Sequence, residues 1–139
     1  KSDGIEKTIE AIRRYKDTKG LIFVNLVDFD MVFGHRRNAN GYGGALEAFD
    51  QRIPQIKDVL GQGDVLIFTA DHGCDPTHMV HTDHTREYVP VLIWGDSIKR
   101  NVNLGTRDTF ADCGQTIADL MGVGPLKFGR SFKKDIING

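Results

Sequence analysis

The sequence predicts an α/β domain in which a layered sheet is flanked by helices. Three nearly continuous apolar runs, at residues 21–27, 64–69 and 89–94, are typical of strands covered on both faces. The segments around them place apolar residues three and four positions apart, as amphipathic helices do. The order helix, strand, helix, strand, strand, helix indicates helices packed on a sheet. Because strands covered on both faces occur mostly in parallel sheets, we expect parallel pairing.

The first half of the chain is predicted to hold two helices separated by a strand and a loop. Residues 4–16 form a surface helix in this prediction, because isoleucines recur on one face. Four glycines and two asparagines within residues 34–44 predict a loop. Apolar residues spaced three and four apart predict a second helix over residues 46–60. Pro54 is expected to kink this helix or end its first part, since proline removes a hydrogen bond.

The second half is predicted to alternate loops with shorter elements. A long polar loop covers residues 73–87, between the second and third strands. A short edge strand is expected at residues 102–104. Residues 110–120 have helical spacing, and Gly122 is expected to end that helix. Residues 123–139 are predicted as a connector followed by a short last helix.

Composition limits the classes of function. A chain of 139 residues with 40% hydrophobic content can bury one core, so we expect one domain or part of one. The net charge of −1 gives no electrostatic footprint for nucleic acid or an acidic membrane surface. Cys74 and Cys113 form no CxxC pair, and no apolar run is long enough for a membrane span, so a cytoplasmic protein is expected. The chain begins at Lys1 without a methionine, which we interpret as a sign of an upstream segment.

Potential metal ligands follow the predicted strands. Asp30 comes shortly after the first apolar run, and Asp71 and His72 come directly after the second. Ligands of α/β proteins gather at the carboxyl ends of strands. Burying the Asp71–His72 pair without a partner would cost several kcal/mol, and a metal ion is the obvious partner. Carboxylate and imidazole ligands suit manganese, zinc or magnesium rather than copper(I) or iron–sulfur.

Other polar residues leave alternatives open. Asp28 could cap a turn or serve the same centre as Asp30. His78 and His81 are interpreted as solvated loop residues despite their proximity to His84 in the sequence. Arg36 and Arg37 could bind phosphate or cover the edge of the sheet. Cys74 has no neighbouring helper residue, so it is interpreted as a plain small side chain.

Three segments carry a resemblance to a known family. They are Asn-Leu-Val-Asp-Phe-Asp-Met-Val-Phe-Gly-His-Arg-Arg at 25–37, Thr-Ala-Asp-His-Gly-Cys-Asp-Pro at 69–76 and Thr-Asp-His-Thr-Arg-Glu-Tyr-Val-Pro at 82–90. They resemble the C-terminal part of the phosphopentomutase family within the alkaline phosphatase superfamily. Asp-His-Gly alone would indicate only the superfamily, whereas the Asp-Phe-Asp and Gly-His-Arg-Arg pair with Thr-Asp-His-Thr-Arg-Glu indicates the mutases. The resemblance covers almost all of the chain and implies an alkaline-phosphatase-like core domain.

The resemblance also implies a set of metal ligands. Asp30, His35 and His84 match the ligands of one Mn²⁺, and Asp71 and His72 match ligands of a second. Mg²⁺, Co²⁺ or Zn²⁺ are potential substitutes. Two such ions can polarise a phosphoryl group and clamp the attacking and leaving oxygens. Residues 78–81, His-Met-Val-His, depart from the Pro-Gly-type turn usual in the family.

The activity implied is interconversion of ribose or deoxyribose 1-phosphate and the 5-phosphate through a phosphothreonine. The family's nucleophilic threonine, another aspartate ligand and the cap domain belong to an N-terminal part that has no counterpart in this chain. Residues 1–139 are therefore expected to be the C-terminal part of the metal-binding core domain. Within these residues we predict no catalytic nucleophile and no mutase activity.

Three other functions are compatible with the same residues. A cofactor-independent phosphoglycerate mutase would act on 3-phosphoglycerate, and a metal-dependent phosphohydrolase of the same superfamily would release phosphate to water. The non-enzymatic alternative is a metal-binding module without turnover. Substrate assays distinguish the enzymes from one another.

Overall fold

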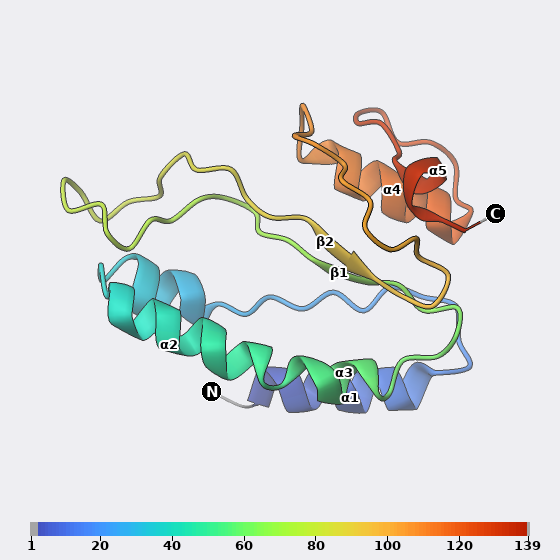
Figure 1. Ribbon diagram of the computed structural model, residues 1–139, viewed down its shortest axis with the longest axis horizontal. Helices are drawn as coiled ribbons and strands as arrows, with labels where there is room; N and C mark the ends of the chain where they lie inside the picture. The colour runs from blue at the N-terminus through green and yellow to red at the C-terminus, as the bar shows by residue number, and fades with distance from the viewer. Residues whose placement is uncertain (1–2, 139) are drawn as a thin grey trace. The chain divides into compact units, whose positions relative to one another are not determined.

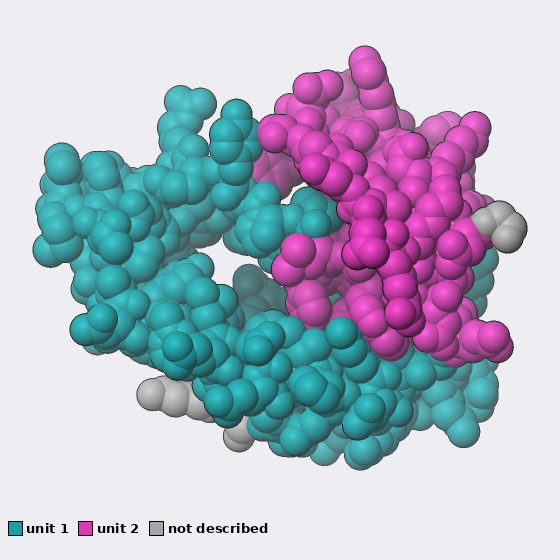
Figure 2. Space-filling model, in the orientation of Figure 1, with its two compact units in different colours: residues 1–61, 69–91 teal, residues 62–68, 92–139 magenta. Residues whose placement is uncertain are grey.

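The computed structural model describes residues 3–138 (Figure 1), and these fall into two compact units (Figure 2). Unit 1 consists of the described residues 3–61 and Thr69–Val91, and unit 2 of Gln62–Phe68 and residues 92–138. Lys1, on which the expectation of an upstream segment rests, lies outside the described residues. Helices and a small sheet are both present, so the predicted mixed α/β class is confirmed.

Unit 1 contains the first predicted helix. Helix α1, Asp3–Tyr15, confirms the helix predicted at residues 4–16. It packs against the short helix α3, Ile53–Lys57, and an ion pair between Glu6 and Arg52 joins the same two regions. The isoleucines buried in these helices are Ile5, Ile9, Ile12 and Ile56.

Helix α2, Ala39–Asp50, begins inside the segment predicted as a loop, so that prediction is wrong for residues 39–44. The side chain of Asn38 accepts a hydrogen bond from the N–H of Gly41 at 2.9 Å and caps the helix. This cap offsets the low helix propensity of the glycines that follow. The predicted interruption at Pro54 is confirmed, because α2 ends at Asp50 and α3 starts anew before the proline.

The strand predicted at residues 21–27 is wrong. None of the described residues pairs with this segment, and Phe23 is 83% exposed. A strand requires a hydrogen-bonding neighbour, so an apolar run alone does not produce one. The chain then enters a π-helix, η1, Phe29–Gly34. Phe29 packs on Tyr42 and Phe49 of α2, with ring centroids 5.5 and 6.4 Å apart.

Unit 2 contains the sheet. Strands β1, Leu66–Phe68, and β2, Leu92–Trp94, pair antiparallel with Ile67 opposite Ile93, which corrects the expected parallel pairing. That expectation assumed burial on both faces, whereas Leu92 is 60% exposed. Among the described residues the sheet has these two strands only, so the edge strand at 102–104 does not form and the predicted layered sheet is not confirmed.

The helices of unit 2 match their predictions. Helix α4, Ala111–Met121, is followed by Gly122 in the left-handed region at φ 70°, the usual glycine termination. Helix α5, Lys133–Ile136, is the predicted short last helix. Phe132, just before α5, is 1% exposed and packs in the core of this unit. No helix among residues 3–138 is long and apolar enough to cross a membrane.

Candidate metal centre

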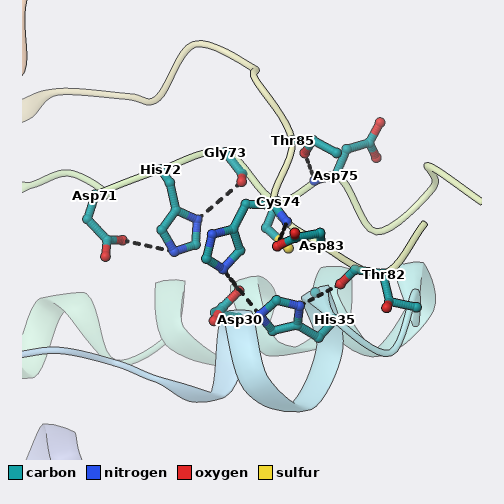
Figure 3. A network of polar contacts seen from close by, with 12 residues as sticks. Asp30, His35, Asp71, His72, Gly73, Cys74, Asp75, Thr82, Asp83 and Thr85 are labelled. Carbon is teal, nitrogen blue, oxygen red and sulfur yellow. Dashed lines mark hydrogen bonds and ion pairs between the residues drawn. The ribbon is translucent and has the colours of Figure 1, made fainter. Parts of the chain in front are cut away.

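Three segments of unit 1 bring histidines and aspartates together (Figure 3). Helix η1 carries Asp30, and His35 is its C-cap residue. The segment after β1 carries Asp71 and His72, and His84 lies further along the same loop between β1 and β2. The structure therefore places four of the five predicted ligands in one cluster, namely Asp30, His35, His72 and His84.

A local antiparallel bridge brings His72 close to His84. Gly73 pairs with Thr85, and the N–H of Thr85 donates to the carbonyl of Gly73 at 3.0 Å. A Cβ at Gly73 would lie 2.8 Å from the carbonyl oxygen of Thr85, so this close approach requires glycine. The imidazole rings of His72 and His84 consequently stack, with centroids 3.6 Å apart and an interplanar angle of 17°.

Asp30 lies at the centre of this cluster with one oxygen unsatisfied. Its Oδ2 is 3.3 Å from Nε2 of His35, and its Oδ1 is 3.6 Å from Nε2 of His84. Oδ1 is buried and has no hydrogen-bond partner among the described residues. Leaving a buried polar atom unpaired costs about 1–3 kcal/mol, and more for a charged group. A cation is the partner that suits such an oxygen.

The donor atoms fit a divalent cation. One ligand atom each from Asp30, His72 and His84 lies within 4.8 Å of the others. A carboxylate oxygen with two imidazole nitrogens is a ligand set for borderline to fairly hard ions such as zinc or manganese. The orphaned oxygen and the mixed donor set thus agree with the metal centre predicted from the sequence.

A backbone carbonyl orients His35. Nδ1 of His35 lies 2.5 Å from the carbonyl oxygen of Thr82. A carbonyl can only accept, so Nδ1 must carry the proton and donate it. The lone pair of the neutral ring is therefore on Nε2, which faces Asp30 and lies 3.2 Å from Nε2 of His84. Fixing the tautomer through the second nitrogen is what metal-binding histidines commonly do.

Asp71 lies apart from the three-donor group. Its side chain is 84% exposed, and its Oδ1 is 3.6 Å from Nε2 of His72. The structure thus brings Asp30 and His72 together, although by loops and a π-helix rather than by the ends of parallel strands. The division of the five residues between two ions stays a prediction.

The remaining polar residues resolve several alternatives. Asp28 occupies the N-cap position of η1 without a side-chain capping bond, so the turn-cap interpretation is wrong. The rings of His78 and His81 contact each other in a tilted arrangement, with centroids 4.6 Å apart and an interplanar angle of 59°. Burial, with a hydrogen bond to Asp30, raises the pKa of the Cys74 thiol. A thiol kept neutral is a poor nucleophile, which agrees with its predicted role as a plain side chain.

Two contributors to this site were not found from the sequence. Thr82 acts through its main-chain carbonyl, which every residue type possesses, so no sequence signal could have identified it. Arg37 was considered for phosphate binding or for the edge of the sheet. Its guanidinium instead contacts main-chain carbonyls of the loop that precedes His84.

Comparison with known proteins defines the class. The family model of the Metalloenzyme superfamily matches residues 1–125, and the chain belongs to that superfamily. The clustered metal donors and the mixed α/β fold agree with this membership.

Among curated proteins the chain is similar to phosphopentomutases. It is 58% identical to the phosphopentomutase of Kosmotoga olearia over 136 residues, which are 98% of this chain and 34% of that protein. It is 56% identical to the phosphopentomutase of Clostridium novyi, with 97% of this chain and 34% of that protein covered. The phosphopentomutase of Clostridioides difficile is 52% identical over 96% of this chain. The chain spans about a third of the length of the curated relatives it matches.

Proposed function

We propose that residues 1–139 are the C-terminal, metal-binding part of the core domain of a phosphopentomutase. The observation that carries the proposal is the cluster of Asp30, His72 and His84, which lies within segments similar to phosphopentomutases along nearly the whole chain. The unsatisfied Oδ1 of Asp30 supports a cation at this position. The protein would belong to the isomerases that transfer a phosphoryl group within one substrate.

The five predicted ligands divide their roles in this proposal. Asp30, His35 and His84 would hold one Mn²⁺, while Asp71 and His72 would contribute to a second. Bound divalent ions would supply neutralisation of phosphoryl charge, which phosphoryl transfer requires more than covalent chemistry. Mg²⁺, Co²⁺ or Zn²⁺ could replace Mn²⁺ with these oxygen and nitrogen donors. The chain's own part is orientation, since the carbonyl of Thr82 accepts from Nδ1 of His35 and so directs Nε2 at Asp30.

The substrate class in this proposal is a pentose phosphate, ribose or deoxyribose 1-phosphate exchanging with the 5-phosphate. The nucleophilic threonine and the cap that holds the sugar would be supplied by the part of a phosphopentomutase outside the matched third. The predicted cytoplasmic location belongs to the same proposal.

Turnover by the longer phosphopentomutase containing this sequence tests the proposal. Conversion of ribose 1-phosphate to ribose 5-phosphate should be lost in His72→Ala and Asp71→Ala, with circular dichroism unchanged. His78→Ala is the matched control, because its ring pairs with His81 outside the donor group, and it should retain activity. Activity on 3-phosphoglycerate, or steady release of phosphate without isomerisation, would contradict the assignment.

The isolated 139-residue chain provides a second test. It should show no mutase turnover with ribose 1-phosphate and Mn²⁺, because members of a catalytic unit removed together leave little activity. Clear turnover would place the nucleophile within the chain, with Thr69, Thr82 and Thr85 as the residues to replace.

A further inference from the structure

The side chain of Arg37 makes more hydrogen bonds to the main chain than the metal ligands around it. Its guanidinium donates to four backbone carbonyls, those of Gly34, Asp75, His81 and Asp83. Nε and Nη2 both donate to His81, at 2.8 and 2.6 Å, and Nη1 donates to Asp75 at 2.9 Å. All three nitrogens of the guanidinium are therefore engaged, which leaves no pair of N–H groups free to bind a phosphate.

Three of these carbonyls, those of Asp75, His81 and Asp83, lie at or near the two ends of one loop. Asp75 opens the loop and Asp83 closes it, immediately before His84. The loop between them is exposed at many positions, with Met79 77% and Val80 84% exposed. Such a segment has little apolar packing to define its path, so the Arg37 hydrogen bonds tie its ends together.

The carbonyl that orients His35 belongs to the same stretch of backbone. The carbonyls of His81 and Asp83 accept from Arg37, and the carbonyl between them, that of Thr82, accepts from Nδ1 of His35. Holding the two flanking peptide groups restricts the orientation of the middle one. Arg37 thereby controls both the acceptor that sets the tautomer of His35 and the peptide from which His84 extends.

The backbone of Arg37 supports a dedicated role. Its φ is 51°, in the left-handed region that costs a residue with a side chain about 1–2 kcal/mol. Residues retain such a conformation when surrounding contacts determine it. Its neighbour Arg36 is exposed and has the same charge, so it offers an internal control.

We propose that Arg37 is a positioning residue of the metal centre, which closes the loop of residues 75–83 through its guanidinium and so orients His35 and His84. The proposal rests on the proposed metal-binding function of these histidines. These hydrogen bonds of Arg37 go to backbone carbonyls rather than to the side chains of the proposed metal ligands. Its effect on His35 and His84 therefore passes through the backbone.

Calorimetric titration of this chain with Mn²⁺ tests the proposal. Arg37→Ala should weaken binding about 10-fold to 100-fold, the range typical of groups that orient metal ligands. Alanine carries the same backbone penalty as arginine in the left-handed region, so the change isolates the guanidinium. Arg37→Lys should recover only part of the loss, because a single ammonium cannot reach both ends of the loop. Arg36→Ala should bind as the unmodified chain does.

A metal-free measurement separates positioning from general stability. For the neutral form of the ring, imidazole ¹⁵N NMR should place the proton of His35 on Nδ1 in the unmodified chain and in Arg36→Ala. A mixture of tautomers is expected in Arg37→Ala. Added millimolar guanidinium should restore both the tautomer and part of the Mn²⁺ affinity, which a merely unfolded variant would not allow.

The outcomes are distinguishable. Unchanged Mn²⁺ affinity in a folded Arg37→Ala overturns the proposal, and if that variant does not fold, unchanged affinity in Arg37→Lys does so. Asp30→Ala is measured alongside. Loss of binding in Asp30→Ala without loss in the Arg37 variants refutes the positioning role alone, whereas unchanged binding in Asp30→Ala refutes the metal centre itself.

Discussion

Asp112 in unit 2 and Asp30 in unit 1 are similar side chains in opposite situations. Asp112 is 3% exposed, yet both of its oxygens are satisfied. The N–H of Arg130 donates to Oδ1 at 2.8 Å, and Arg107 donates to Oδ2 at 2.8 Å. Asp30 has a side chain that is 31% exposed, but its buried Oδ1 has no hydrogen-bond partner in the described part of the chain.

The difference separates a structural carboxylate from a proposed metal ligand. The chain provides the complete set of donors for Asp112, so this carboxylate stabilises the link between α4 and the segment that follows it. Around Asp30 the chain provides two histidines and the Cys74 thiol instead, and histidine is itself a common ligand for a cation. Burial alone would rank Asp112 as the more unusual group, whereas the identity of the partners supports Asp30 as the proposed metal ligand.

The largest expected effect on stability is that of Asp112→Ala. Removing one member of a buried ion pair leaves Arg107 and the N–H of Arg130 unpaired, which costs about 3–5 kcal/mol for a fully buried pair. The Arg107 side chain is 28% exposed, so we expect the lower end, about 3 kcal/mol. Urea denaturation at neutral pH measures this change.

Asp30→Ala is the matched substitution. Without metal it should change the free energy of unfolding little or increase it, because a carboxylate with one unsatisfied buried oxygen is removed. With Mn²⁺ at about 100 times its dissociation constant, the unmodified chain should gain about 2.7 kcal/mol and Asp30→Ala nothing. A metal-independent loss of stability in Asp30→Ala as large as that of Asp112→Ala would remove the distinction between the two residues.

Acid should lower the stability of the chain through protonation of Asp112. Burial alone would raise its pKa, but the N–H of Arg130 and the guanidinium of Arg107 together hold the pKa of Asp112 below its ordinary value. A depressed pKa contributes stability that is present above the unfolded-state pKa of about 3.9 and is lost as the pH falls through the folded-state value. Melting temperatures at pH 6 and at pH 3 should therefore differ more for the unmodified chain than for Asp112→Asn. Equal pH dependence in both would show that Asp112 does not gain from its partners.

Thr116 extends the same network and should have a smaller effect. Its hydroxyl donates to the carbonyl of Asp112 at 2.7 Å and accepts from the N–H of Phe132 at 3.0 Å, at a residue with no exposed surface. Thr116→Val keeps the shape but leaves the N–H of Phe132 unpaired, at a cost of about 1–3 kcal/mol. Thr116→Ser keeps the hydroxyl and loses one methyl group, worth about 0.8 kcal/mol. Serine destabilising more than valine, by chemical denaturation, would mean that packing rather than the hydrogen bond matters here.

The helices could be predicted from the sequence better than the sheet. The isoleucine stripe of α1 and the terminating Gly122 of α4 are local signals, and the helices form where they indicate. Strand pairing depends on a second segment, so the run at 21–27 could not reveal that it lacks a partner among the described residues. The glycines at the start of α2 led to the prediction of a loop, although Asn38 just before them caps a helix.

The candidate site could be predicted as residue types but not as contacts. Asp30, His72 and His84 were selected from motifs, and the structure places their donor atoms together. The tautomer of His35 and the role of Arg37 depend on backbone carbonyls, which carry no sequence signal. The fully satisfied Asp112 also could not be recognised from sequence, because Arg130 reaches it through a main-chain N–H.

The smallest expected effect is at the ion pair between Glu6 and Arg52 in unit 1, whose side chains are 54% and 25% exposed. Exposed pairs contribute about 0.2–1 kcal/mol, so Glu6→Gln should lower the free energy of unfolding by less than 1 kcal/mol. In 1 M salt the Debye length falls to about 3 Å, and the difference between Glu6→Gln and the unmodified chain should disappear.

The salt dependence of stability should differ between the Glu6–Arg52 pair and the Asp112–Arg107 pair, because a buried pair is screened far less than an exposed one. Denaturation in urea at low and high salt, with Glu6→Gln and Asp112→Ala side by side, should show a salt-sensitive loss for the first and a nearly constant loss for the second. Arg107 and Arg130 would then stabilise Asp112 through short hydrogen bonds in a dry environment rather than through long-range attraction. If both losses vanish in salt, the interactions of Asp112 with Arg107 and Arg130 are screened like those of an exposed ion pair. The contrast between a fully hydrogen-bonded Asp112 and an incompletely hydrogen-bonded Asp30 would then no longer support Asp30 as a metal ligand.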